Sequence, residues 1–138
     1  MQKPIGPDHI YELSADTQPS MSPDSALVAY VRSQIDRESM TVLSWIMLAS
    51  DPEGETRAFT HGRADSEPRF SPDGKWLAFV RKDSAARKQL WVMQVDGGEA
   101  RQLTCVPGGA GDYAWSPDSG RIVYISDVKP SDQSEDVR

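Results

Sequence analysis

Residues 67–104 read Glu-Pro-Arg-Phe-Ser-Pro-Asp-Gly-Lys-Trp-Leu-Ala-Phe-Val, then a polar loop, then Gln-Leu-Trp-Val-Met-Gln-Val-Asp-Gly-Gly-Glu-Ala-Arg-Gln-Leu-Thr. This stretch decides the fold because it is one complete copy of a repeat. Its segment Ser71-Pro72-Asp73-Gly74 predicts a tight turn: proline presets φ, aspartate bonds back to the backbone, and glycine takes a positive φ without strain. We expect this turn to join a strand ending at Phe70 to a second strand over residues 75–81.

The second strand is apolar on both faces. One face carries Trp76, Ala78 and Val80, and the other carries Leu77 and Phe79. A sheet with one face in water would alternate apolar and polar residues instead. A third strand is expected over residues 89–95, then a hairpin at residues 96–98 and a short, more polar fourth strand over residues 100–104, suited to an outer edge. The unit is therefore predicted to be a four-stranded antiparallel meander covered on both sides.

The turn recurs along the chain. Ser22, Ser71 and Ser116 each begin a Ser-Pro-Asp turn, and they are spaced 49 and 45 residues apart. Repeats of this length are typical of propeller blades and similar arrays. The fold class predicted is all-β, a partial β-propeller of about two and a half four-stranded antiparallel blades.

The repeat divides the chain into five segments. They are a lead-in with a short helix (1–17), blade 1 (18–60), blade 2 (61–104), the first half of blade 3 (105–127) and a polar loop or tail (128–138). In the lead-in, Asp8 is expected to cap a helix over residues 9–13. The third copy lacks strands three and four, and blades bury their faces only against neighbours. We expect either a truncated piece of a longer protein or a sheet arrangement completed by another chain through exposed blade edges.

Composition narrows the classes of partner. The net charge of −6 argues against nucleic acid and anionic membranes, which require clustered lysine and arginine. The basic run at residues 81–82 and 87–88 is interpreted as a solvated hairpin tip. Cys105 is the only cysteine, so no disulfide forms within the chain. With no hydrophobic signal core or membrane span in the sequence, we expect a cytoplasmic location.

At these residues the sequence resembles the propeller repeats of the prolyl oligopeptidase family, and most of all the acylaminoacyl peptidase branch. The resemblance covers about residues 8–127 and rests on residues 70–79, 90–93 and 96–104. The same class includes the Tol-system propeller and other binding propellers. The lead-in at residues 9–13 and the charged loop at residues 34–38 favour the peptidase branch.

The resemblance implies the N-terminal propeller of a serine peptidase, a hydrolase in which a C-terminal α/β-hydrolase domain carries serine, aspartate and histidine. The propeller would restrict access and orient peptide substrates. This chain has no Gly-x-Ser-x-Gly nucleophile elbow, so the catalytic domain is expected outside it. A non-enzymatic propeller scaffold for protein–protein binding is the alternative, and a self-assembling ring of several chains is a third reading.

Several residues are candidate sites, and a structural role is expected for most of them. Turn stabilisation accounts for Asp24, Asp73 and Asp118. Core packing is expected for Trp45, Trp76, Trp91 and Trp115. Arg69 and Arg101 either reach a peptide carboxylate or pair with nearby Glu67 or Glu99. His9 and His61 lack partners for catalysis or metal binding, and the glycine-rich residues 107–111 are interpreted as a connection between blades. No catalytic, cofactor-binding or metal residue is assigned, and no cofactor is expected.

Overall fold

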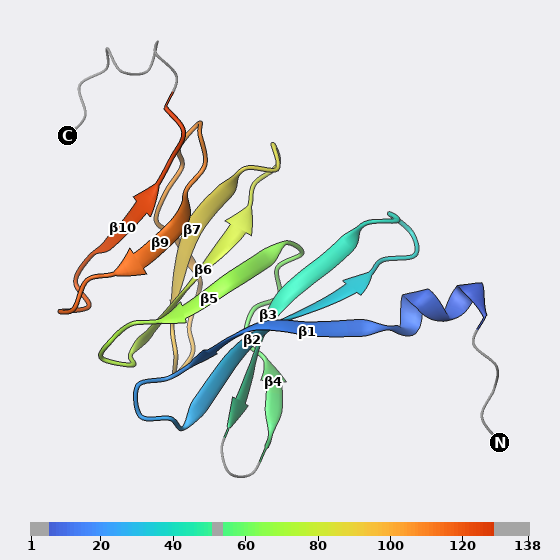
Figure 1. Cartoon of the computed structure of the whole chain (residues 1–138), viewed down its shortest axis with the longest axis horizontal. Coiled ribbons are helices and arrows are strands. Elements are labelled where there is room, and N and C mark those ends of the chain that lie inside the picture. Colours follow the sequence, from blue (N-terminus) through green and yellow to red (C-terminus); the bar gives the residue numbers. More distant parts are fainter. Residues whose placement is uncertain (1–5, 51–53, 129–138) are drawn as a thin grey trace.

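The computed structural model describes residues 6–50 and 54–128, which form three antiparallel sheets that follow one another along the chain (Figure 1). The first sheet orders β1 (Ser14–Met21), β2 (Leu27–Ile35), β3 (Val42–Ser50) and β4 (Thr56–Ala58). The second orders β5 (Asp65–Phe70), β6 (Trp76–Lys82), β7 (Lys88–Gln94) and β8 (Arg101–Gln102). The third pairs β9 (Gly111–Trp115) with β10 (Ile122–Ile125). The prediction of a partial propeller with two complete meanders and half of a third is confirmed.

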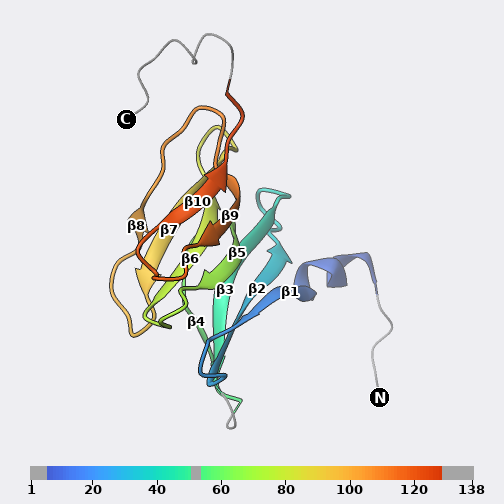
Figure 2. The same cartoon turned by 60° about the vertical axis from the view of Figure 1, so that its left-hand side comes forward.

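The sheets stack face to face, and both faces of the second sheet are buried. From β6, Leu77 and Phe79 join a core shared with the first sheet. Ala78 and Val80, which alternate with them, join a second core shared with the third sheet. Figure 1 shows the second sheet between the other two, and Figure 2 shows the third sheet in front of the second. Apolar residues on both faces of one strand, as the sequence predicted, are therefore what a blade with two neighbours requires.

Two boundaries near the N-terminus differ from the prediction. β1 begins at Ser14, inside the stretch assigned to the lead-in, because residues 14–17 pair with β2. The helix is a 3-10 helix, Pro7–Glu12, so Asp8 lies within its first turn instead of preceding it. Proline favours the first helical position because its φ is already suitable. Of the predicted tail, residues 129–138 lie outside the described residues.

A bulge recurs in the first strand of every blade. Gln18, Glu67 and Asp112 each lie four residues before a turn serine and each has a positive φ, between 43° and 54°. The strand pairing shifts register beside each of them. The Glu67 N–H donates to Gln18 Oε1 (2.7 Å), so the bulge of one blade binds the bulge of the next. Neighbouring first strands, β1 and β5, consequently lie side by side.

No helix among the described residues is both long and apolar enough to cross a membrane.

Candidate functional site

The three Ser-Pro-Asp turns share one set of hydrogen bonds. In the second blade, the Ser71 hydroxyl donates to Asp73 Oδ1 (2.6 Å) and accepts from the Trp76 N–H (3.0 Å). Asp73 Oδ1 also accepts from the Lys75 N–H (3.0 Å). The same bonds form in the other two turns. These contacts account for the recurring serines and aspartates as turn-forming residues.

These hydrogen bonds also set the acidity of the turn aspartates. The serine hydroxyl, followed by a backbone N–H, lowers the pKa of Asp24, Asp73 and Asp118 below the ordinary value of 3.8. Each carboxylate belongs to a different blade. Within residues 6–50 and 54–128, no group of three or more histidine, cysteine, aspartate or glutamate side chains is placed to hold a metal ion.

The two histidines lie outside the Ser-Pro-Asp turns. His9 Nδ1 accepts a hydrogen bond from the Gly6 N–H (2.6 Å) inside the N-terminal helix. His61 is exposed in the connection between β4 and β5. The turn serines donate to aspartate, so none of the three is bonded to a histidine base in the part of the chain described.

The basic run does not form a solvated tip as a whole. The Arg81 guanidinium donates twice to the Asp65 carboxylate, at 2.6 and 3.0 Å, and lies 4.7 Å from the centroid of the Trp91 ring. Asp65 is completely buried. Arg87 and Lys88 remain near the hairpin and pair with Asp83 and Glu67. The prediction of a solvated hairpin tip is therefore wrong for Arg81, because its planar guanidinium makes two parallel hydrogen bonds to a buried carboxylate.

The tryptophans are half-buried, which corrects the prediction that all four belong to the core. Trp91 and Trp115 pack against the two cores from the side. The indole N–H of a tryptophan needs a partner, which favours positions at the edge of a core. Trp115 Nε1 donates to the Arg69 carbonyl oxygen (3.0 Å) in the neighbouring blade.

Arg69 and Tyr113 connect the second and third blades. The Arg69 guanidinium donates to the Tyr113 carbonyl oxygen and lies 4.9 Å from the centroid of its ring. The Tyr113 hydroxyl faces the carbonyl oxygens of Glu67 and Ala78, and burial raises the pKa of this tyrosine. Neither predicted role of Arg69, a peptide-carboxylate ligand or a partner of Glu67, describes these contacts. Arg69 holds two blades together.

Two threonines that follow the outer strands bond to the backbone of the third strand in their blades. The sequence alone predicts no role for them. Thr60 Oγ1 accepts from the Ile46 N–H (2.9 Å), and Thr104 Oγ1 accepts from the Leu90 N–H (2.8 Å). Thr104 also donates to the buried Gln89 (2.8 Å). The signal was present, because both blades end on an apolar residue followed by threonine. Residues 107–110 of the glycine-rich stretch lie in the connection from β8 to β9, as predicted, and Gly111 begins β9.

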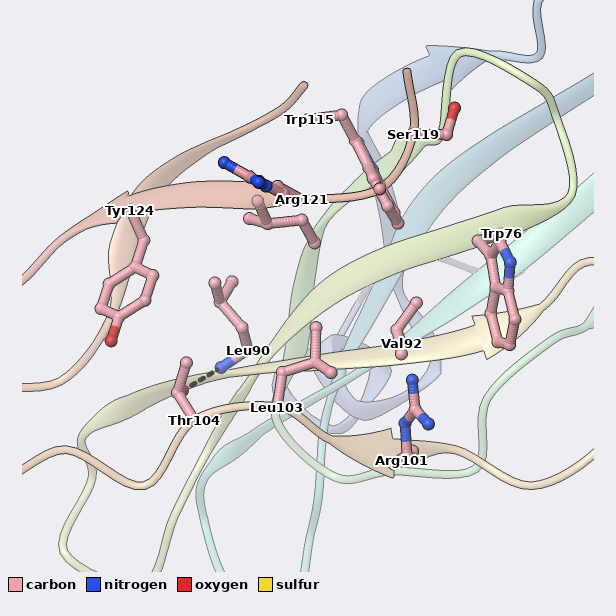
Figure 3. Close-up of a pocket in the computed structure, with 12 residues that line it drawn as sticks. Trp76, Leu90, Val92, Arg101, Leu103, Thr104, Trp115, Ser119, Arg121 and Tyr124 are labelled. Carbon is pink, nitrogen blue, oxygen red and sulfur yellow. Dashed lines mark hydrogen bonds between the residues drawn. The ribbon is translucent and has the colours of Figure 1, made fainter. Parts of the chain in front are cut away.

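A groove opens between the outer half of the second blade and β10. Its cavity measures about 380 Å³. Figure 3 shows Trp76 and Arg101 from the second blade on one side, and Trp115, Arg121 and Tyr124 on the other. The Arg101 guanidinium lies 6.0 Å from the centroid of the Trp76 ring. Within the described residues no carboxylate forms an ion pair with Arg101, so the predicted partner Glu99 is not used.

Comparison with curated proteins relates the chain to peptidases. It is 35% identical over 137 residues to the uncharacterized peptidase YuxL of Bacillus subtilis, which covers 99% of this chain and 21% of that protein. It is 33% identical over 121 residues to dipeptidyl-peptidase 5 of Porphyromonas endodontalis, which covers 85% of this chain and 17% of that protein. The chain therefore spans about a fifth of the length of the curated relatives it matches.

Solved structures share the fold at lower identity. The acylaminoacyl peptidase of Pyrococcus horikoshii superposes with a TM-score of 0.75 at 23% identity, over 94% of this chain and 20% of that one. The propeller domain of the Trilobed protease from Pyrococcus furiosus superposes with a TM-score of 0.68 at 20% identity. This match covers 83% of this chain and 34% of that one. The family described as the TolB beta propeller domain matches residues 17–134. With this match over most of its length and with its four-stranded blades, the chain belongs to the TolB β-propeller domain family.

Proposed function

We propose that the chain is the N-terminal propeller portion of a serine-type peptidase similar to the acylaminoacyl peptidases. The observation that carries the proposal is the likeness to the peptidase YuxL, which extends over 137 residues and so includes both complete blades and the start of the third. The similarity to dipeptidyl-peptidase 5 points the same way.

In this proposal the propeller limits access to peptides and orients them, and hydrolysis belongs to an α/β-hydrolase domain outside these 138 residues. The chemistry of the described residues supports this division. A serine nucleophile needs a base within hydrogen-bond reach, yet the hydroxyls of Ser22, Ser71 and Ser116 are held by aspartates in turns. The interblade bonds of Arg69 and Tyr113 suit a rigid frame for a catalytic domain.

Two measurements test this function. The purified chain should not hydrolyse chromogenic acyl-amino-acid or dipeptide substrates, with a mock purification as the control for contaminating proteases. The coding sequence downstream of the Arg138 codon should encode further blades and then a Gly-x-Ser-x-Gly segment. Hydrolysis by the chain alone, or blades without such a segment, would contradict the proposal.

A non-enzymatic propeller scaffold for protein partners is the second candidate. It is favoured by 40% identity over 50 residues to the Tol-Pal system protein TolB of Nitratidesulfovibrio vulgaris, which covers 36% of this chain and 11% of that protein. Blades alone downstream of Arg138 would support it over the peptidase.

A cytoplasmic location belongs to the same proposal. The exposed Cys105 suits a reducing compartment, where thiols stay free. Fractionation of cells that express the protein, with antibody detection of the propeller, would test the location.

A further inference from the structure

A second cavity lies between the first and second blades, both of which are complete four-stranded sheets. It measures about 620 Å³. The first blade lines it with Leu27 and Arg57, and the second blade lines it with residues 74–76 and 94–96. These residues lie at the end of the two sheets where the Ser-Pro-Asp turns are. Sites for small molecules in proteins usually measure about 300–1,000 Å³, so this cavity has a suitable size.

The apolar part of the cavity wall is fixed by backbone hydrogen bonds. Leu27 and Val95 line the cavity and also pack against the core shared by the first two blades. The Leu27 carbonyl oxygen accepts from the Ser22 N–H (2.8 Å), and the Val95 N–H donates to the Lys75 carbonyl oxygen (2.9 Å). An apolar group that covered these two side chains would remove their remaining exposed surface from water, which is favourable.

Three charged side chains line the same cavity. Arg57 comes from the first blade, and Lys75 and Asp96 come from the second. All three are exposed, and none of them forms an ion pair with any residue that the structure describes. By contrast, Arg81 and Lys88 of the second blade are both paired. Two cations and one carboxylate are therefore available to a ligand in the cavity.

We infer that this cavity binds a small zwitterion with apolar side chains, of the class of unblocked dipeptides. The ligand carboxylate pairs with Arg57 and Lys75, and the ligand ammonium pairs with Asp96. Its side chains cover Leu27 and Val95. A guanidinium suits the carboxylate because it can donate two parallel hydrogen bonds to it.

The charges of the cavity disfavour simpler ligands. A ligand with only negative charge would meet the like charge of Asp96, and a ligand with only positive charge would meet those of Arg57 and Lys75. A zwitterion finds an opposite charge at each end. The inference goes beyond both proposed functions and holds for either, because every residue of the site lies within the two complete blades.

The test uses the intact, isotopically labelled 138-residue chain, titrated with leucylleucine and followed by two-dimensional NMR. The backbone amide signals of Gly74, Val95 and Asp96 should shift and saturate, with a Kd below about 1 mM. N-acetyl-leucylleucine lacks the ammonium and leucylleucine amide lacks the carboxylate, so each should bind at least about tenfold more weakly. Free leucine keeps both charges but covers less of the apolar wall, so it should also bind more weakly than leucylleucine.

Variants of the chain test which residue meets which end of the ligand. Arg57→Gln should weaken binding of leucylleucine at least about tenfold, and so should Asp96→Asn. In Asp96→Asn the difference between leucylleucine and its acetyl derivative should disappear, because the partner of the ammonium is gone. Lys82→Gln is the matched control: it removes an exposed charge at the other end of β6 and should leave binding unchanged. Should Arg57→Gln unfold, Lys75→Gln tests the same end of the ligand.

Four results would overturn the inference. They are the lack of saturable shifts at millimolar leucylleucine, shifts confined to amides outside the cavity, equal binding by Arg57→Gln and Lys82→Gln, and binding of leucylleucine no tighter than that of free leucine or of the two blocked derivatives.

Discussion

Two ion pairs with the same pattern of two hydrogen bonds should contribute very differently to stability. Asp65 pairs with Arg81 in the second blade and Asp16 with Arg32 in the first, each through two hydrogen bonds of 2.6 to 3.0 Å. The Asp65 side chain is 0% exposed, whereas that of Asp16 is 47% exposed. Removing one partner of a buried pair strands the other charge, so we expect Asp65→Asn to cost about 3 kcal/mol. Exposed pairs contribute less than about 1 kcal/mol, the limit expected for Asp16→Asn.

Urea unfolding followed by far-ultraviolet circular dichroism would measure both free energies of unfolding. With a typical urea dependence for a small protein, a loss of about 3 kcal/mol lowers the midpoint by roughly 1.5 M. Asp16→Asn is the matched control, because it removes the same bonds at the equivalent position. Equal costs for the two variants would refute the reasoning that burial determines the contribution of this pair.

Three further outcomes are expected from the same unfolding measurement. Ser25 has a φ of 60° where the equivalent Gly74 has 74°, so Ser25→Gly should stabilise and Gly74→Ser destabilise, each by about 1 kcal/mol. An added Cβ at Gly62 would lie 2.2 Å from an Asp65 carboxylate oxygen, so Gly62→Ala should lower the free energy of unfolding by about 2 kcal/mol. Gly111→Ala is the control, because its Cβ meets nothing closer than 4.0 Å, and it should change this free energy little. The turn aspartates have a lowered pKa in the folded state. Their stabilisation is therefore present at pH above their ordinary pKa and is lost as the pH falls through the lowered pKa. Changing all three to Asn should make the free energy of unfolding depend less on pH in this acidic range.

The sequence predicted what local chemistry determines. Turn residues at a fixed spacing placed the hairpins, and two-faced apolar strands indicated blades with neighbours on both sides. Ser25 stands at the turn position that Gly74 occupies in the second blade. The structure takes the strain: Ser25 keeps the turn and a positive φ.

Contacts between blades were not predictable from one blade's sequence. The bulges at Gln18, Glu67 and Asp112 carry no glycine to signal a positive φ. Arg69 looked like a surface residue because its partner, Tyr113, is 44 residues away in the next blade. The sequence predicts core positions for the tryptophans because they lie in strands expected to be buried on both faces, whereas their indole N–H groups favour the edges of a core.

The exposure of the Asp–Arg pair differs between the first and second blades. Arg81 lies on the same side of β6 as Phe79, which faces the first blade. The central carbon of its guanidinium lies 5.3 Å from the centroid of the Phe79 ring. Arg32 is the equivalent residue in the first blade, and its guanidinium carbon lies 5.7 Å from the centroid of the Tyr30 ring. Both side chains lie on the side of the first blade that faces away from the second. In the third blade the pair is absent, since Ala110 stands at the aspartate position. Any surface that covers Asp16 would therefore raise the cost of Asp16→Asn toward that of Asp65→Asn, because the geometry of the pair is already formed and only its exposure differs.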